Sequence, residues 1–222
     1  FYLDLPLSYL DNTTFYDHQS YWDINQGVNQ TWTDGMVNAY FSKEAAGNCG
    51  YFSPSHDVVV LAHACTNPGD KTLPHEVGHF FSLPHTFNGW EGGNVPSPNQ
   101  QEKVNGSNCN YAADGFCDTP PDYAYYRWTC PLSDTLIDPN GDTLDVDGSL
   151  IMSYSDDACA NRFSNEQDNA MYNNWQYQRT DISALANVST AALDTSHQIY
   201  PGDGQVIPFN YVKLKWRAVE GA

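Results

Sequence analysis

The stretch HEVGHFFSLPH, from His75 to His85, carries the strongest signal for fold and chemistry in this chain. His75 and His79 are four residues apart, so both imidazoles would project from the same face of an α-helix. Two imidazoles at that spacing can bind one Zn²⁺ at about 2 Å from each nitrogen. Glu76 is poorly placed to bind the metal itself, but it can reach a water on the metal and act as a general base. His85 would return as a third ligand, which leaves a fourth position open for water, as in catalytic zinc sites.

The residues around this motif predict a short, partly buried helix. Pro74 suits the first turn, where its missing N–H costs nothing, and the helix must end before Pro84. Val77, Phe80 and Phe81 would form the apolar side of the helix, packed on the core. A bare HExxH also occurs by chance in helices that bind nothing, so the third histidine is what favours zinc.

Length and composition limit the possible classes of protein. A chain of 222 residues with 41% hydrophobic residues can form one sizeable domain, or one domain and a fragment of another. It contains no run of 18 apolar residues, so no membrane-spanning helix is expected. It opens FYLDLPLSYL without the basic segment of a signal peptide, which predicts a processed piece of a longer precursor. A formal charge of −18 argues against nucleic-acid binding. Calcium or basic substrates could use this charge, but a solubilising surface of a secreted protein is the favoured interpretation.

The cysteines are even in number and none belongs to a CxxC pair, so a cysteine zinc site is not expected. Three disulfides formed in an oxidising, extracellular compartment are the natural interpretation. Six cysteines allow fifteen pairings, of which we predict Cys49–Cys65, Cys109–Cys117 and Cys130–Cys159.

The rest of the chain predicts a few further elements. Residues 36–42 and 57–65 have strand patterns, with a loop expected over 50–56. The β-branched run in 57–65 would be buried, or would form an edge strand beside a cleft. Ser164 and Gln167 match a capping box, which predicts a helix to about Arg179. We expect one domain over 1–196, followed by a linker and the start of another module over 197–222.

The long Gly- and Asn-rich segment 88–122 needs something to hold it, and a disulfide and a cation are the candidates. Four oxygen donors in this region are candidate calcium ligands, although a hydrated acidic loop is the alternative: Glu91, Asp114, Asp118 and Thr119. The later DPNGD and DVDG sequences lack the full spacing of a calcium loop and are predicted to be turns.

Three motifs in this order, HEVGHFFSLPHTF, CDTPPD and IMSY, resemble the pappalysin (cytophagalysin) family of metzincin zinc proteases over roughly residues 36–180. The resemblance implies that His75, His79 and His85 are the zinc ligands and that Glu76 is the general base. It also implies that Met152 belongs to the Met-turn below the zinc and that Tyr154 stabilises the tetrahedral intermediate. The four candidate calcium ligands fall where relatives bind calcium, and strand 57–65 would be the edge strand that pairs with the substrate.

Two features depart from the family pattern. Ser82 occupies the position where metzincins usually have glycine, and a left-handed backbone there would cost about 1–2 kcal/mol. Little before residue 36 looks helical, so the amino-terminal helix of the family is expected to be missing. The segment YPGDGQVIPFNYVKLKW resembles the opening of a fibronectin-type III-like module.

Together these features predict an α/β (α+β) metzincin-like domain. It would have a twisted, mostly parallel sheet with an antiparallel edge strand, an active-site helix and a loop-rich C-terminal subdomain containing a Met-turn. The predicted function is a secreted zinc endopeptidase that acts on protein or peptide substrates, with Zn²⁺ as catalytic and Ca²⁺ as structural cofactor. The alternative is a non-catalytic zinc-containing module for peptide binding or adhesion, which Glu76 and Tyr154 argue against, because a decayed enzyme has no need of them.

Overall fold

The computed structural model describes residues 10–32, 34–182, 198–200 and 215–216. The chain divides into two units, 1–182 and 183–222. In the second unit the described residues form two short antiparallel strands, β6 (Gln198–Tyr200) and β7 (Lys215–Trp216). Most of the predicted fibronectin-like segment lies outside the described residues. No helix in the described part of the chain is long and apolar enough to cross a membrane.

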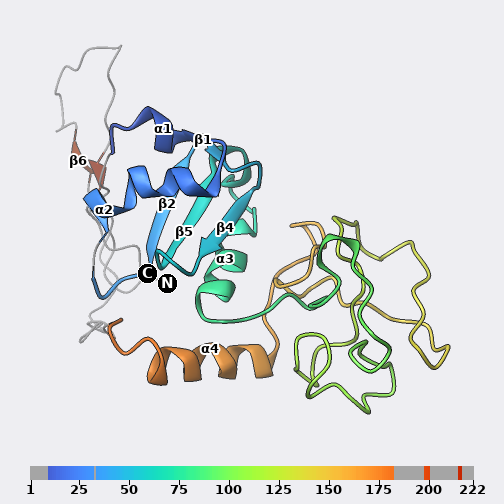
Figure 1. Cartoon of the computed structure of the whole chain (residues 1–222). Helices are drawn as coiled ribbons and strands as arrows, with labels where there is room; N and C mark the ends of the chain where they lie inside the picture. Colours follow the sequence, from blue (N-terminus) through green and yellow to red (C-terminus); the bar gives the residue numbers. More distant parts are fainter. Residues whose placement is uncertain (1–9, 33, 183–197, 201–214, 217–222) are drawn as a thin grey trace. The chain divides into compact units, whose positions relative to one another are not determined.

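The first unit is built on a three-stranded mixed sheet with the order β2-β5-β4 (Figure 1). β2 (Asn38–Ser42) runs parallel to β5 (Val58–Ala62), and β4 (Gly50–Ser53) pairs with β5 in the antiparallel direction. The predicted antiparallel edge strand is therefore confirmed, but the sheet is not mostly parallel, because it contains one parallel and one antiparallel pair.

Two of the strand predictions were wrong. The segment 57–65 is not an edge strand: β5 lies between two neighbours, and all five of its residues are buried. A continuous β-branched run is typical of such a doubly covered strand. The edge is β4, in the segment predicted to be a loop, because its four half-buried residues show no alternation and become a strand through pairing with β5.

The two faces of β5 pack against different layers. Val58, Val60 and Ala62 belong to one apolar cluster, together with Phe15, Ile24 and Val28 from the amino-terminal segment. Val59 and Leu61 pack on the other face, with Phe80 of helix α3.

The amino-terminal layer corrects the expectation that no helical element precedes residue 36. It contains α1 (Thr13–Tyr16), the 3₁₀ helix η1 (Tyr21–Gln26) and α2 (Val28–Thr31), and short strands β1 (Asp17–His18) and β3 (Glu44–Ala45) pair beside it. The Asn12 side chain caps α1, and Ser20 with Asp23 forms a capping box on η1. These helices are too short to produce a clear periodic pattern in the sequence, which explains why the prediction missed them.

Helix α3 (Thr72–Phe80) carries the histidine motif, and it ends before Pro84 as predicted. The 3₁₀ helix η2 (His63–Cys65) precedes it. Ser82 follows the end of α3 with φ of +69°, so this turn does need the left-handed conformation that glycine adopts easily. Its hydroxyl accepts a hydrogen bond of 2.8 Å from Asn174 Nδ2 of helix α4 (Asn165–Tyr177).

Replacing Ser82 tests the cost of this conformation. We expect Ser82→Gly to be more stable than Ser82→Ala by about 1 kcal/mol, because both lose the hydroxyl and only glycine relieves the left-handed strain. Chemical denaturation of the two variants measures the difference. Equal stability of the Gly and Ala variants would contradict a strained turn.

Between α3 and α4 the chain is almost entirely loops and turns, with one short 3₁₀ helix, η3 (Glu91–Gly93). All three predicted disulfides are present: Cys49–Cys65, Cys109–Cys117 and Cys130–Cys159. The DPNGD sequence is a turn, as predicted, since the Asp138 carboxylate accepts backbone N–H groups of Asn140 and Asp142. The capping box predicted at Ser164 and Gln167 begins α4, and both of its hydrogen bonds are formed.

Candidate metal centre

Three imidazoles converge where α3 meets the loop that follows it. His75 and His79 project from α3, and the chain turns back after Ser82 to bring His85 beside them. One nitrogen from each of the three lies within 4.8 Å of the other two, and no other group of three potential ligands in the described residues meets this criterion. The structure thus assembles the three residues that the motif predicted.

The second nitrogen of each ring is held by a different partner. His75 Nδ1 lies 2.7 Å from the Ile151 carbonyl oxygen, and His79 Nδ1 lies 2.8 Å from the Leu83 carbonyl oxygen. His85 Nδ1 lies 3.2 Å from Glu91 Oε1. A carbonyl or carboxylate can only accept, so each Nδ1 carries the proton and each Nε2 carries a lone pair.

This arrangement fits a cation. His79 Nε2 and His85 Nε2 face each other at 3.1 Å, with a lone pair on each, which is unfavourable unless a positive charge lies between them. Burial lowers the pKa of His75 and of His85 to about 3 and also lowers the pKa of His79. The rings are therefore neutral, which is the form that binds a metal. A set of three neutral imidazoles suits Zn²⁺ in particular.

Glu76 is buried next to His75, and it lines the same cleft as the histidines. Burial raises the pKa of this carboxyl to about 8, and a hydrogen bond from the backbone of Phe52 in β4 partly offsets the effect. A bound cation nearby would favour the ionised form. Glu76 thus has the access and the proton affinity that a general base near neutral pH requires.

Tyr154 packs against the histidines from the loop-rich region. Its ring centroid lies 4.9 Å from that of His85 and 4.6 Å from that of Phe87. Burial, followed by the charges of Glu76 and Glu91, raises the pKa of Tyr154, so its hydroxyl keeps its proton and can donate a hydrogen bond.

Met152 lies directly against α3 and is completely buried. A Cβ added at Gly78, one residue before His79, would fall far inside van der Waals contact with Met152 Sδ. The Met152 carbonyl accepts a hydrogen bond of 3.2 Å from the Thr86 N–H, beside His85. Met152 therefore contacts both α3, which carries His75 and His79, and the loop that carries His85.

The histidines, Glu76 and Tyr154 line one cleft of about 740 Å³. The lining also includes residues 50–52 of the edge strand β4 and, from the loop region, Ser155. A cleft lined by a strand edge can hold an extended chain.

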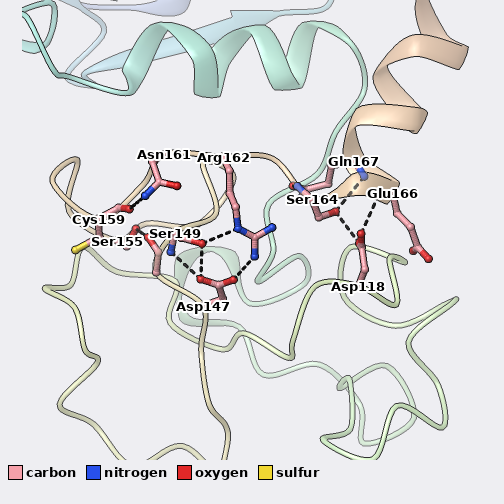
Figure 2. Close-up of polar contacts among 11 residues, drawn as sticks. Asp118, Asp147, Ser149, Ser155, Cys159, Asn161, Arg162, Ser164, Glu166 and Gln167 are labelled. Atoms are coloured by element: carbon pink, nitrogen blue, oxygen red, sulfur yellow. Dashed lines mark hydrogen bonds and ion pairs between the residues drawn. The ribbon is translucent and has the colours of Figure 1, made fainter.

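The four predicted calcium ligands have different contacts in the structure. Glu91 contacts His85, as described above. Asp118 lies at the start of α4, where it accepts hydrogen bonds from Ser164 Oγ at 2.6 Å and Glu166 N at 2.9 Å (Figure 2). Asp114 and Thr119 remain together, with the Thr119 hydroxyl 3.0 Å from both carboxylate oxygens of Asp114.

Two acidic residues near Asp114 were missed. Glu102 is 2% exposed, and its Oε2 has no hydrogen-bond partner, whereas Asp122 accepts bonds from Thr86 Oγ1 and Ser153 Oγ at 2.7 and 3.0 Å. Burial, followed by repulsion from Asp114 and Asp122, raises the pKa of Glu102 to about 8. Asp122 belongs to the CDTPPD motif, which could have identified it, but nothing near Glu102 in the sequence marks it as buried.

Comparisons with known proteins agree with this site. Residues 56–176, more than half of the chain, match the model of the peptidase M43 family, described as pregnancy-associated plasma protein-A. An extracellular metalloprotease of Verticillium alfalfae is 35% identical over 113 residues, or 50% of this chain and 32% of that protein. The chain thus spans about a third of the length of this relative.

Two solved structures of mirolysin are also similar to the chain. One is Tannerella forsythia mature mirolysin in complex with a cleaved peptide, and the other is mirolysin in complex with compound 9. Each has a TM-score of 0.46 and 23% identity, and each alignment covers 66% of this chain and 55% of the other. The family match begins two residues before β5 and extends through the histidine triad into α4, and on this basis the chain belongs to the M43 (pappalysin) family of metallopeptidases.

Proposed function

We propose that this chain is the catalytic part of a secreted zinc-dependent endopeptidase. The observation that carries the proposal is the set of three half-buried imidazoles, each held through Nδ1 with Nε2 turned towards a shared point, next to the buried Glu76. Membership of a metallopeptidase family supports it.

His75, His79 and His85 would hold the metal. When bound, Zn²⁺ supplies the Lewis acid that polarises the scissile carbonyl and makes a water nucleophilic near neutral pH. The proposed ligand set leaves one coordination position for that chemistry.

Glu76 acts as the proton shuttle. Its ionised carboxylate takes a proton from the attacking water, and the carboxylic acid then donates a proton to the leaving amine. Tyr154, which keeps its hydroxyl proton, donates a hydrogen bond to the substrate carbonyl oxygen as negative charge develops on it.

The substrate is an extended peptide that pairs with the edge strand β4. Among the described strands β4 pairs with β5 alone, and residues 50–52 line the cleft that contains Glu76. Addition of a strand at this edge would place the peptide across the histidines through main-chain hydrogen bonds, which depend little on side chains.

Met152 takes the role of the Met-turn methionine. It fills the space below α3 at Gly78, and the neighbouring Ile151 carbonyl fixes the tautomer of His75. It therefore supports the ligands by packing and takes no part in the chemistry.

The three disulfides and the extracellular relative support secretion. Disulfides persist in oxidising compartments, and one of them, Cys49–Cys65, joins the start of β4 to η2 beside the cleft.

Removal and return of the metal test the proposed function. A zinc chelator should abolish cleavage of an unstructured protein such as casein, and added Zn²⁺ should restore it. Cleavage that survives complete removal of zinc would contradict the proposal, and so would a zinc-loaded chain that binds peptides but never cleaves them, which would favour the binding module.

We also propose that calcium binds the loop region at Glu102 and Asp114, with Thr119 nearby. Buried carboxylates without cationic partners are unfavourable, and Ca²⁺ prefers oxygen ligands of this kind. This assignment retains two of the four ligands predicted from the sequence and replaces the other two with Glu102.

Calcium should stabilise the protein in a pH-dependent way. Without a cation, burial raises the pKa of Glu102 from 4.5 to about 8, so the folded state retains a proton that the unfolded state has lost. The calcium-free protein should therefore lose stability as the pH rises from 4.5 through about 8. Ca²⁺ at about 100 times its Kd should add about 2.7 kcal/mol at the alkaline end of this range and much less at the acidic end.

Thermal unfolding with and without Ca²⁺ measures this effect. Glu102→Gln should remove most of the calcium response, whereas the control Asp168→Asn, at an exposed position of α4, should keep it. An equal response in both variants would exclude Glu102 as a ligand.

A further inference from the structure

Among the described groups that hydrogen-bond to Nδ1 of the three histidines, Glu91 is the only side chain, because His75 and His79 are held by backbone carbonyls. We propose that Glu91 is a positioning residue that holds His85 for zinc, rather than a ligand of calcium. This inference rests on the proposed function, since it concerns the third ligand of the same metal site.

The geometry around His85 supports this role. The His85 ring stacks on Phe87 with centroids 4.5 Å apart and an interplanar angle of 10°, which fixes the plane of the imidazole. Rotation within that plane is then set by the contact between Nδ1 and Glu91 Oε1. With Nδ1 oriented in this way, Nε2 is directed towards His79 Nε2.

The Glu91 carboxylate is itself held in place. Its second oxygen, Oε2, accepts a hydrogen bond of 2.7 Å from the Gly89 N–H. Trp90 stacks on Tyr123 with centroids 4.3 Å apart, and the Asn94 side chain donates to the Glu91 carbonyl at 2.7 Å. Gly93 has φ of +80°, and an added Cβ would meet Tyr125 Oη at 3.0 Å, so the turn after Glu91 is closely packed.

These contacts separate Glu91 from an ordinary surface carboxylate. The side chain is 44% exposed, and an ion pair of that exposure would contribute little to folding stability. Its effect should instead appear in metal binding. A carboxylate hydrogen-bonded to a ligating histidine fixes the tautomer, orients the ring and increases the basicity of the other nitrogen.

The test is the zinc affinity of three variants, measured by competition with a chromophoric chelator. We expect Glu91→Ala to bind zinc about 10–100 times more weakly than the wild type. The zinc affinity of Glu91→Gln should lie between those of the wild type and Glu91→Ala. Its amide oxygen can still accept a hydrogen bond from His85 Nδ1 but carries no charge. The control Asp168→Asn removes one negative charge from an exposed position on α4 and should bind zinc as the wild type does.

Two further measurements distinguish positioning from a structural role. The zinc-free forms of the wild type and Glu91→Ala should unfold at the same temperature, and the Co²⁺-substituted variant should have an altered visible absorption spectrum. Equal zinc affinity of wild type and Glu91→Ala would overturn the inference while leaving the proposed function intact. A lower unfolding temperature of the zinc-free variant would also overturn it. Failure of the wild type to bind zinc would overturn the proposed function, and the inference with it.

Discussion

Glu76→Gln should reduce peptide hydrolysis by about 10²–10⁴-fold while the protein still binds zinc. The amide has nearly the same shape as the carboxyl, so the fold should be preserved. It cannot take a proton from water, so proton transfer by residue 76 is lost. Glu76 is buried on α3 between two histidines that hold their tautomers through other residues, and for this reason zinc binding should persist. Steady-state cleavage of a quenched peptide, beside metal analysis of the same preparation, measures both quantities.

The matched control is Glu44→Gln on β3, outside the residues that line the cleft. It should retain full activity and zinc content. A Glu76→Gln enzyme that keeps most of its activity would exclude Glu76 as the general base. Loss of zinc together with activity would mean that Glu76 supports the metal site in some other way.

Gly78→Ala should destabilise the protein by about 1–3 kcal/mol, the usual cost of overpacking a core. At an exposed helical position the same change would add up to about 1 kcal/mol, since alanine is the better helix former. Here the new methyl group would clash with Met152 Sδ and lie 3.3 Å from Phe163 Cε1. It should therefore push apart α3 and the segment whose Ile151 carbonyl holds His75, and zinc affinity should fall as well.

A double-mutant cycle with Met152→Ala isolates this contact. In the Met152→Ala background, which leaves a cavity, Gly78→Ala should cost much less than in the wild type. Denaturant unfolding of the four proteins gives the coupling energy. The same cost in both backgrounds, or a stabilising effect of Gly78→Ala in the wild type, would contradict close packing of Met152 on α3.

The sequence predicted the parts of the site that depend on local spacing. His75, Glu76 and His79 are on one helix, and His85 follows within a turn, so a short segment determines their relative positions. The partners of these residues could not be predicted in the same way. The Ile151 carbonyl, which holds His75, is 76 residues away in the chain, and only the folded loop region brings it there.

The same reason explains the errors in the sheet and the contacts that the predicted calcium ligands make. The four residues of β4 have no strand pattern of their own, and pairing with β5 determines their conformation. Asp118 and Glu91 have the oxygen donors that calcium prefers, but the fold uses one to cap α4 and the other to contact His85. Side-chain chemistry identifies what a residue can bind, whereas its actual partner depends on long-range contacts.

The measurement that tests the central claim most directly is a zinc titration of the metal-free chain, with casein cleavage recorded at every step. A zinc endopeptidase with one site predicts that activity rises in proportion to added zinc and stops rising at one zinc ion per chain. Zinc bound at that stoichiometry without cleavage at any point of the titration would contradict the account, and it would identify the chain as a zinc-containing binding module instead.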